Sequence, residues 1–262
     1  MKPSTQRAVR VGGLTWQVIE TRAPRGAPVL VMLPGTLGTA SIFADVMAAL
    51  GSRVRMVSVS YPLIDDIVRL ADSLARLLDA LGIERASIVG SSLGGFLAQH
   101  FAGRHSQRVD RLILGNTLCD PELTRKVVNR TPVQTLREAP ASAHRDMIVN
   151  SVKGWPETDP ATSRLKALLL DSGTRLLSAR SLKARVLAVQ AAPAVPALDI
   201  AADRITIIDC VDDPLLPRVV QDAVVRQYPG AHHLRLSGGG HYPYVVRTAA
   251  YVAALEQALA LS

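Results

Sequence analysis

Short runs of β-branched residues alternate with longer amphipathic runs over the first 118 residues or so. Predicted strands lie at 29–33, 53–59, 86–89 and 111–114. Residues 41–50 and 66–81 have the spacing of helices, and Gly82 supplies a stop for the second. Alternation of this kind predicts a mostly parallel sheet with helices on both faces.

Two regions depart from the alternation. Residues 7–11 and 14–19 flank Gly12-Gly13 and predict a hairpin, which would add antiparallel strands at one edge of the sheet. After Cys119 the pattern is mainly helical to about residue 203, including the ambiguous stretch 184–190, into which helical spacing runs without a turn signal. Further elements follow as a strand at 204–210, a helix at 217–228, a strand at 233–236 and a helix at 244–259. The sequence therefore predicts a core domain at 1–119 and 204–262, with a helical lid inserted at 120–203.

The pentapeptide Gly90-Ser91-Ser92-Leu93-Gly94 joins the strand at 86–89 to a predicted helix that ends near Arg104. A nucleophilic serine in such a strand-to-helix turn is crowded, so the positions two before and two after it must be small. Ser92 meets this condition through Gly90 and Gly94. Ser91 does not, because Leu93 would fill the crowded position. Ser92 is therefore the candidate nucleophile.

His241 is the candidate general base. A serine hydroxyl needs a base within hydrogen-bond reach, and that base must be oriented by a carboxylate. His241 follows the last predicted strand and lies between three glycines and Tyr242-Pro243, at the start of a helix. The other five histidines occupy positions typical of solvated or packing residues.

Three aspartates are candidates for the acid that orients His241. Asp213 is preferred, because Asp-Pro-x-x-Pro places it on a turn between a strand and a helix. Asp212 is adjacent and could instead cap the turn, while Asp120 follows the preceding strand and could also reach the histidine. Asp209 lies within a strand and is less suited. Serine, acid and histidine in this chain order form one of the known arrangements of a catalytic triad.

Acyl transfer also needs donors for the oxyanion. One usually comes from the backbone N–H after the nucleophile, here Leu93, and another from an early strand-to-helix loop. The loop at 33–38 follows a buried strand, and its glycines allow close approach of the backbone. Thr36 is the expected second donor, with Leu37 next.

Together these features resemble the α/β-hydrolase superfamily over nearly the whole chain. More narrowly, several segments are similar to maspardin and its bacterial relatives: Leu33-Pro34, Gly38-Thr39-Ala40, Tyr61-Pro62, residues 92–99, Gly238-Gly239 and residues 242–244. Maspardin is regarded as a non-catalytic binding protein with an altered histidine position, whereas His241 and Asp213 are present here. Pro34 replaces the histidine of the superfamily's usual His-Gly motif, which generally organises the first loop and does not react.

The charge and aromatic content of the chain limit the kinds of molecule that it is expected to bind. The chain has 262 residues, 48% of them hydrophobic, and a net charge of +8. Its arginines are scattered and lack interleaved aromatics, which argues against nucleic-acid binding. The positive net charge is compatible with an anionic partner such as an acyl-CoA or an acyl carrier protein. We expect a cytoplasmic protein, because no signal peptide, transmembrane segment or disulfide pattern is present.

The predicted function is hydrolysis of a carboxylic ester or thioester through an acyl-enzyme, without a metal or an organic cofactor. The lid would cover the serine and shape an apolar pocket, with Tyr61, Leu63, Trp155 and Tyr242 as candidate lining residues that could equally be core. One alternative is a catalytically silent, maspardin-like binding protein. Another keeps the triad but catalyses C–C bond hydrolysis, a lyase reaction or haloperoxidation, because the fold does not determine the reaction.

Overall fold

A computed structural model describes residues 4–128 and 130–261, so the outermost residues of the predicted core ranges and one residue of the predicted lid lie outside it. Its centre is an eight-stranded sheet in the order β1-β2-β4-β3-β5-β6-β7-β8, antiparallel at β1-β2-β4 and parallel from β4 onward. The strands are β1 (Ser4–Val11), β2 (Leu14–Thr21), β3 (Val29–Leu33), β4 (Arg55–Ser60), β5 (Ala86–Ser91), β6 (Val109–Gly115), β7 (Ile205–Cys210) and β8 (His232–Leu236). The predicted α/β class is confirmed.

The predicted hairpin forms the antiparallel edge of the sheet. Gly12 and Gly13 have φ angles of 55° and 79°, which glycine adopts without steric cost and which a two-residue hairpin turn requires. The inner strands differ from this edge, because β5 and β7 are buried along their whole length. Burial on both faces is what a parallel sheet covered by helices requires.

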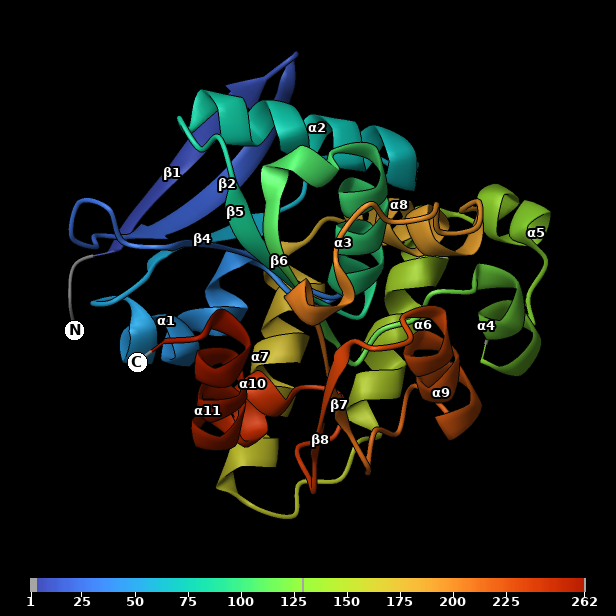
Figure 1. Cartoon of the computed structure of the whole chain (residues 1–262). Coiled ribbons are helices and arrows are strands. Elements are labelled where there is room, and N and C mark those ends of the chain that lie inside the picture. The colour runs from blue at the N-terminus through green and yellow to red at the C-terminus, as the bar shows by residue number, and fades with distance from the viewer. Residues whose placement is uncertain (1–3, 129, 262) are drawn as a thin grey trace.

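Helices cover both faces of the sheet, and each layer has its own hydrophobic cluster. Helices α2 (Ile67–Ala80), α3 (Leu93–Arg104) and α9 (Arg218–Gln227) pack into one cluster, and helices α1 (Ala44–Leu50), α10 (Pro243–Val246) and α11 (Thr248–Leu259) into the other. Figure 1 shows α2 and α3 on one side of the sheet and α1, α10 and α11 on the other. The side chain of Asp66 accepts the backbone N–H of Arg69 and so caps α2 at its predicted start.

Two predicted helices are divided in the structure. The expected helix at 41–50 begins with the 3₁₀ turn Ala40–Phe43, where serine hydroxyls of β4 bind the backbone of Ala40 and hold the turn against the sheet. The expected final helix is interrupted at Arg247, whose φ of −130° and ψ of 48° are not helical. There the hydroxyl of Thr248 binds the carbonyl of Tyr244, in place of the helical backbone bond.

The segment between β6 and β7 is helical. It contains α4 (Pro121–Val127), α5 (Val133–Glu138), α6 (Ala141–Lys153), α7 (Pro160–Asp171), the π-helical turn Ser172–Leu176 and α8 (Ala179–Gln190). The ambiguous stretch 184–190 lies in α8, as predicted. Side chains of this segment enter both core clusters, including Ala188 in one and Val152, Leu165 and Leu182 in the other. We call residues 120–203 the cap.

None of the described helices is long and apolar enough to cross a membrane.

Candidate functional site

Ser92 occupies a strained turn between β5 and α3. Its φ of 55° and ψ of −121° lie in a region that non-glycine residues rarely adopt. A Cβ atom at Gly90 would lie 2.1 Å from the Gly94 carbonyl oxygen, and one at Gly94 would lie 1.9 Å from that of Leu33. Both flanking glycines are therefore required sterically, as expected for an elbow. The Ser92 N–H faces the carbonyl oxygens of Gly115 (3.0 Å) and Asn116 (3.1 Å), which fixes the turn against the end of β6.

A third glycine contributes to the same turn. A Cβ atom at Gly95 would lie 2.6 Å from the Cβ of Thr117, whose hydroxyl donates to the Ser92 carbonyl at 2.7 Å. The pentapeptide pattern does not include Gly95. The Gly94-Gly95 pair in the printed sequence is the signal that could have indicated it.

His241 and Asp213 form a buried hydrogen-bonded pair. The distance from His241 Nδ1 to Asp213 Oδ2 is 2.8 Å, and the side chains are 4% and 0% exposed. The other carboxylate oxygen of Asp213 accepts the N–H groups of Leu215 at 2.8 Å and Leu216 at 3.1 Å. An ionised carboxylate can only accept, so Nδ1 carries the proton and Nε2 is left as a base.

The remaining acid candidates have other partners. Asp120 caps α4, where its Oδ1 accepts two backbone N–H groups at 2.9 Å each. Asp209 bonds His233 and Arg235 on β8. Among the described residues, Asp213 is the aspartate that bonds His241.

Asp212 supports the loop that carries His241. Its carboxylate accepts the N–H of Gly239 at 3.2 Å and that of Gly240 at 3.0 Å. These glycines have φ angles of 120° and 57°, which favour glycine and allow both N–H groups to face one carboxylate. Asp212 and Asp213 therefore act on the same histidine from two sides, one through the backbone and one through the ring.

Asn116 connects the serine turn to the histidine loop and was not identified from the sequence. Its side-chain N–H donates to the Gly240 carbonyl at 2.8 Å, and its side-chain oxygen accepts the Cys210 N–H at 2.9 Å. Its backbone carbonyl accepts the Ser92 N–H. Asn116 is buried with a φ of 33°, and its place two residues after the predicted strand at 111–114 is the signal that could have identified it.

The first loop lies against Ser92. A Cβ atom at Gly35 would be 3.3 Å from that of Ser92. The loop is a turn in which the Gly38 N–H donates to the Gly35 carbonyl at 3.0 Å, and the Tyr61 hydroxyl donates to the Pro34 carbonyl at 2.6 Å. Burial raises the pKa of Tyr61, so this hydroxyl keeps its proton. Tyr61, a predicted pocket residue, thus lies beneath the loop.

The cap also contacts this loop. Arg185 of α8 is 2% exposed, and its Nη1 donates to the carbonyls of Thr36 at 2.9 Å and Gly38 at 2.6 Å. Its guanidinium carbon lies 5.0 Å from the centre of the Tyr61 ring. No local sequence pattern indicates this residue, because the contact joins elements about 150 positions apart.

A cavity of about 460 Å³ joins these parts of the core to the cap. Ser92, Leu93, Thr36, Leu37 and His241 line it together with apolar side chains of the cap, Leu118, Leu215 and Leu216. Trp155 and Tyr242, two of the candidate lining residues, also border this cavity. Leu63 is 45% exposed and lies in a separate surface hollow beside Arg180 and Lys183. Burial raises the pKa of Tyr242, and the nearby charge of Asp213 raises it further, so its hydroxyl stays neutral.

A second cavity, of about 740 Å³, lies next to the first. The two share Trp155, His241 and Tyr242, and the second is more polar because the glycine loop, Asp212, Lys166 and Arg247 line it. His241 therefore lies between an apolar cavity that contains Ser92 and a somewhat more polar one that does not.

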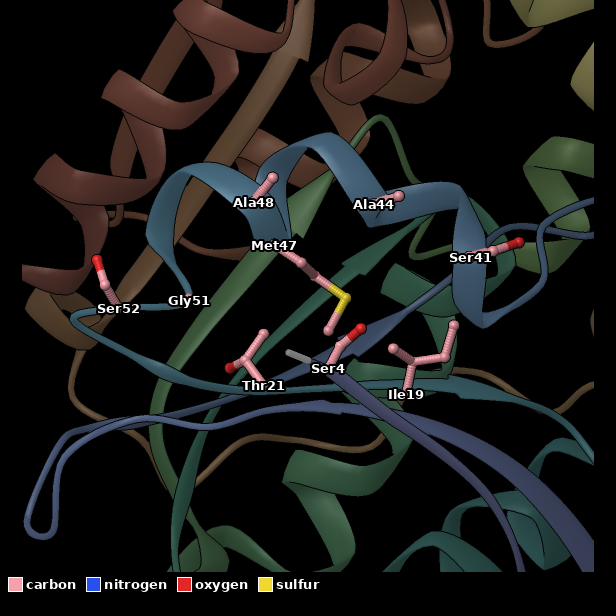
Figure 2. Close-up of a pocket in the computed structure, with 9 residues that line it drawn as sticks. All are labelled: Ser4, Ile19, Thr21, Ser41, Ala44, Met47, Ala48, Gly51 and Ser52. Atoms are coloured by element: carbon pink, nitrogen blue, oxygen red, sulfur yellow. The ribbon is translucent and has the colours of Figure 1, made fainter. Parts of the chain in front are cut away.

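Figure 2 shows a smaller cavity, of about 120 Å³, between α1 and the β1–β2 hairpin. The side chain of Met47 extends from α1 toward Ser4 and Thr21. None of its nine lining residues is acidic, basic or a histidine, so it offers no base for a nucleophile. In the described residues there is also no cluster of three or more His, Cys, Asp or Glu side chains that could hold a metal ion.

The eight-stranded sheet, the serine turn and the buried aspartate–histidine pair define an α/β-hydrolase fold. The family model described as the alpha/beta hydrolase family matches residues 30–254, and the chain belongs to this family. Maspardin from Danio rerio is 29% identical over 226 residues, covering 84% of this chain and 70% of maspardin, and human maspardin is 29% identical over 224 residues, covering 84% and 71%. The resemblance noted in the sequence is thus confirmed.

Bacterial hydrolases are also similar. A 2-hydroxy-6-oxononadienedioate/2-hydroxy-6-oxononatrienedioate hydrolase from Paraburkholderia xenovorans is 39% identical over 127 residues, 42% of this chain and 44% of that enzyme. The crystal structure of the enol-lactonase from Burkholderia xenovorans superposes with a TM-score of 0.76 at 20% identity, covering 97% of this chain and 100% of that one. The latter similarity supports the fold.

Proposed function

We propose that this protein is a serine hydrolase that cleaves a carboxylic ester or thioester through an acyl-enzyme. The observation that carries the proposal is the 2.8 Å bond between His241 and Asp213, both buried, beside a cavity that Ser92 also lines. A buried carboxylate on Nδ1 orients the imidazole and stabilises its protonated form, which is what a base for a serine hydroxyl needs.

In the proposed reaction, Nε2 of His241 takes the Ser92 proton as the serine oxygen attacks the substrate carbonyl. The N–H groups of Leu93 and Thr36, with Leu37 as the further candidate, face the oxyanion. Within the described part of the chain, Leu93 and Thr36 donate to no protein acceptor, so both N–H groups are free for a ligand. His241 then protonates the departing alcohol or thiol. A water molecule, deprotonated by His241, releases the acid and restores Ser92.

The two cavities suggest where the acyl part and the leaving group of the substrate would bind in this proposal. The apolar cavity around Ser92 suits an acyl chain, with the cap over residues 120–203 as its lid. The second cavity, the more polar of the two, adjoins His241, the residue that protonates the leaving group in this proposal. The substrate is a small molecule, and an acyl-CoA or an acyl carrier protein fits the net charge of +8. Two free buried cysteines fit a reducing compartment such as the cytoplasm.

Labelling with a fluorophosphonate probe tests the proposal. We expect wild-type protein to be labelled, Ser92→Ala to be unlabelled and Ser91→Ala, changed one residue away at the end of β5, to remain labelled. A panel of p-nitrophenyl esters of graded chain length and acyl-thioesters would then define the substrate, and activity on acyl-CoA that falls with added salt would support an acidic partner. Folded wild-type protein that neither labels nor hydrolyses any of these would instead support a silent binding protein.

A further inference from the structure

Arg185 is a buried cation without a carboxylate partner among the described residues. Two carbonyl oxygens, those of Thr36 and Gly38, accept from its Nη1, while its Nε and Nη2 have no hydrogen-bond partner in that part of the chain. Burying a charge without a counterion is costly, and burial lowers the pKa of Arg185 to about 10. At neutral pH the side chain is still charged. Such a residue calls for an explanation beyond packing.

The two carbonyls belong to the loop that faces Ser92. In a planar trans peptide, the carbonyl and the N–H of the next residue point in opposite directions. The Thr36 carbonyl shares its peptide with the Leu37 N–H, so a cation on that carbonyl leaves the N–H on the far side. It also polarises the peptide, which makes this N–H a stronger donor. Leu37 and Arg185 therefore act at opposite ends of one peptide group.

The two candidate donors of the loop differ in this respect. The Thr36 N–H shares its peptide with the Gly35 carbonyl, which accepts the neutral Gly38 N–H at 3.0 Å. The Leu37 N–H shares its peptide with the Thr36 carbonyl, which accepts from Nη1 of the charged Arg185 at 2.9 Å. Both residues line the apolar cavity with Ser92. A hydrogen bond from the Leu37 N–H would therefore stabilise an oxyanion in that cavity more than one from the Thr36 N–H. The guanidinium fixes the dipole of the Thr36–Leu37 peptide and enhances it.

We propose that Arg185 is a positioning residue, which holds the loop at 35–38 in its donor geometry from the cap and strengthens the Leu37 N–H toward the oxyanion. This role rests on the proposed serine-hydrolase function. It also accounts for Pro34, because the loop is organised here by Tyr61 from the sheet and Arg185 from the cap. The loop is complete only when α8 is docked, so the reactivity of Ser92 depends on the position of the cap.

Steady-state hydrolysis of a p-nitrophenyl ester by Arg185→Met, Arg185→Lys and the control Arg180→Met tests the proposal. Arg180 is an exposed arginine on the same helix. We expect Arg185→Met to lower kcat by about 10- to 100-fold, less than the loss of a direct oxyanion donor, with KM within about threefold of wild type. Arg185→Lys keeps a cation on a single donor nitrogen and should recover part of the loss. Arg180→Met should behave as wild type.

A spectroscopic measurement separates polarisation from simple packing. In ¹⁵N-labelled protein, loss of the bonds to the Thr36 and Gly38 carbonyls should move the amide nitrogens of Leu37 and Thr39 upfield, and Thr36 less. If Arg185→Met does not fold, Arg185→Lys carries both measurements, with a smaller loss of kcat in the same direction.

The outcomes distinguish the two proposals. Wild-type protein without labelling or hydrolysis would overturn the serine-hydrolase function, and the role of Arg185 with it. An active wild type with unchanged kcat in folded Arg185 variants would overturn the positioning role alone. So would a rise in KM at constant kcat, because Arg185 would then shape the cavity without acting on the oxyanion loop.

Discussion

Two aspartate–histidine pairs lie within a few residues of each other at the β7–β8 side of the sheet. Asp209 bonds His233 at 2.9 Å, and Asp213 bonds His241 at 2.8 Å. By distance alone the pairs are equivalent. They differ in position, because Asp209 and His233 are on the strands themselves, whereas Asp213 and His241 are on loops beyond their carboxyl ends.

They differ also in their surroundings. Asp209 accepts two hydrogen bonds from Arg235, its register partner on β8, so its charge is already neutralised when His233 approaches. The side chain of His233 is 26% exposed, and the residue is absent from the lining of both large cavities. Asp213 has no cationic partner among the described residues except His241, and that histidine borders both cavities. An aspartate–histidine contact therefore indicates a candidate site only when the carboxylate is free of other cations and the ring faces a cavity.

Substitution of each histidine should give the largest difference in activity between the two pairs. If the protein acts as proposed, His241→Ala should lower kcat for ester hydrolysis by about 10⁴-fold or more, because Ser92 would lose its proposed base. His233→Ala should leave kcat within about twofold of wild type and lower the melting temperature slightly. Steady-state kinetics on both purified variants measures this. Equal losses in the two variants would contradict the assignment of the base.

Removing the charge of each aspartate gives the next largest effect. Asp213→Asn should lower kcat by about 10³- to 10⁴-fold, since the amide cannot stabilise the protonated imidazole. Asp209→Asn should instead leave kcat nearly unchanged and lower the free energy of unfolding by about 2 kcal/mol, through weakened charge-assisted bonds to Arg235. Kinetics and chemical denaturation of the same preparations provide the comparison. Activity loss confined to the Asp209 variant would reverse the roles.

The pH dependence of stability should also distinguish Asp209. Burial raises the pKa of this carboxyl, but hydrogen bonds from Arg235 and His233 outweigh it and hold the pKa below its usual range. The unfolded chain therefore binds the proton more readily, and the stabilisation is complete above about pH 4 and lost as the pH falls through the folded-state pKa. The difference in unfolding free energy between wild type and Asp209→Asn should shrink below pH 4. A difference that stays constant down to pH 2 would argue against the ion pair.

Among the residues that hold His241 and its loop, Asp212 should give the smallest loss of activity. It holds the Gly239 and Gly240 N–H groups without touching His241, so Asp212→Ala should lower kcat by about 10-fold through a less ordered loop. Addition of small carboxylates should not restore activity, because the defect is one of position. A loss as large as that of Asp213→Asn would indicate that Asp212 takes part in orienting the imidazole directly.

Much of the fold was predictable, because its signals are local. The hairpin glycines, the buried β-branched runs and the capped helix at 66–81 each express a preference of a few neighbouring residues. The two divided helices were not predicted. Their breaks depend on contacts that helical spacing does not encode, such as the serines of β4 that hold Ala40.

The candidate site divides in the same way. Ser92, Asp213 and His241 belong to short motifs whose glycines and prolines indicate a required backbone conformation, and the structure places all three beside one cavity or in direct contact. Asn116 and Arg185 carry no such local signature. Their candidate roles depend on hydrogen bonds to backbone atoms far away in the chain, which a single sequence does not reveal.

The cap contributes side chains to the hydrophobic clusters on both faces of the sheet. A lid that contacted the core only at its two connections could be deleted or exchanged as a unit. Removal of this cap would instead expose the apolar core surfaces that Val152, Leu165, Leu182 and Ala188 cover. We expect cap and core to unfold in a single cooperative transition. Substrate preference in this chain would then be changed more readily by substitutions at the cavity face of α6 and α8 than by exchange of the whole cap.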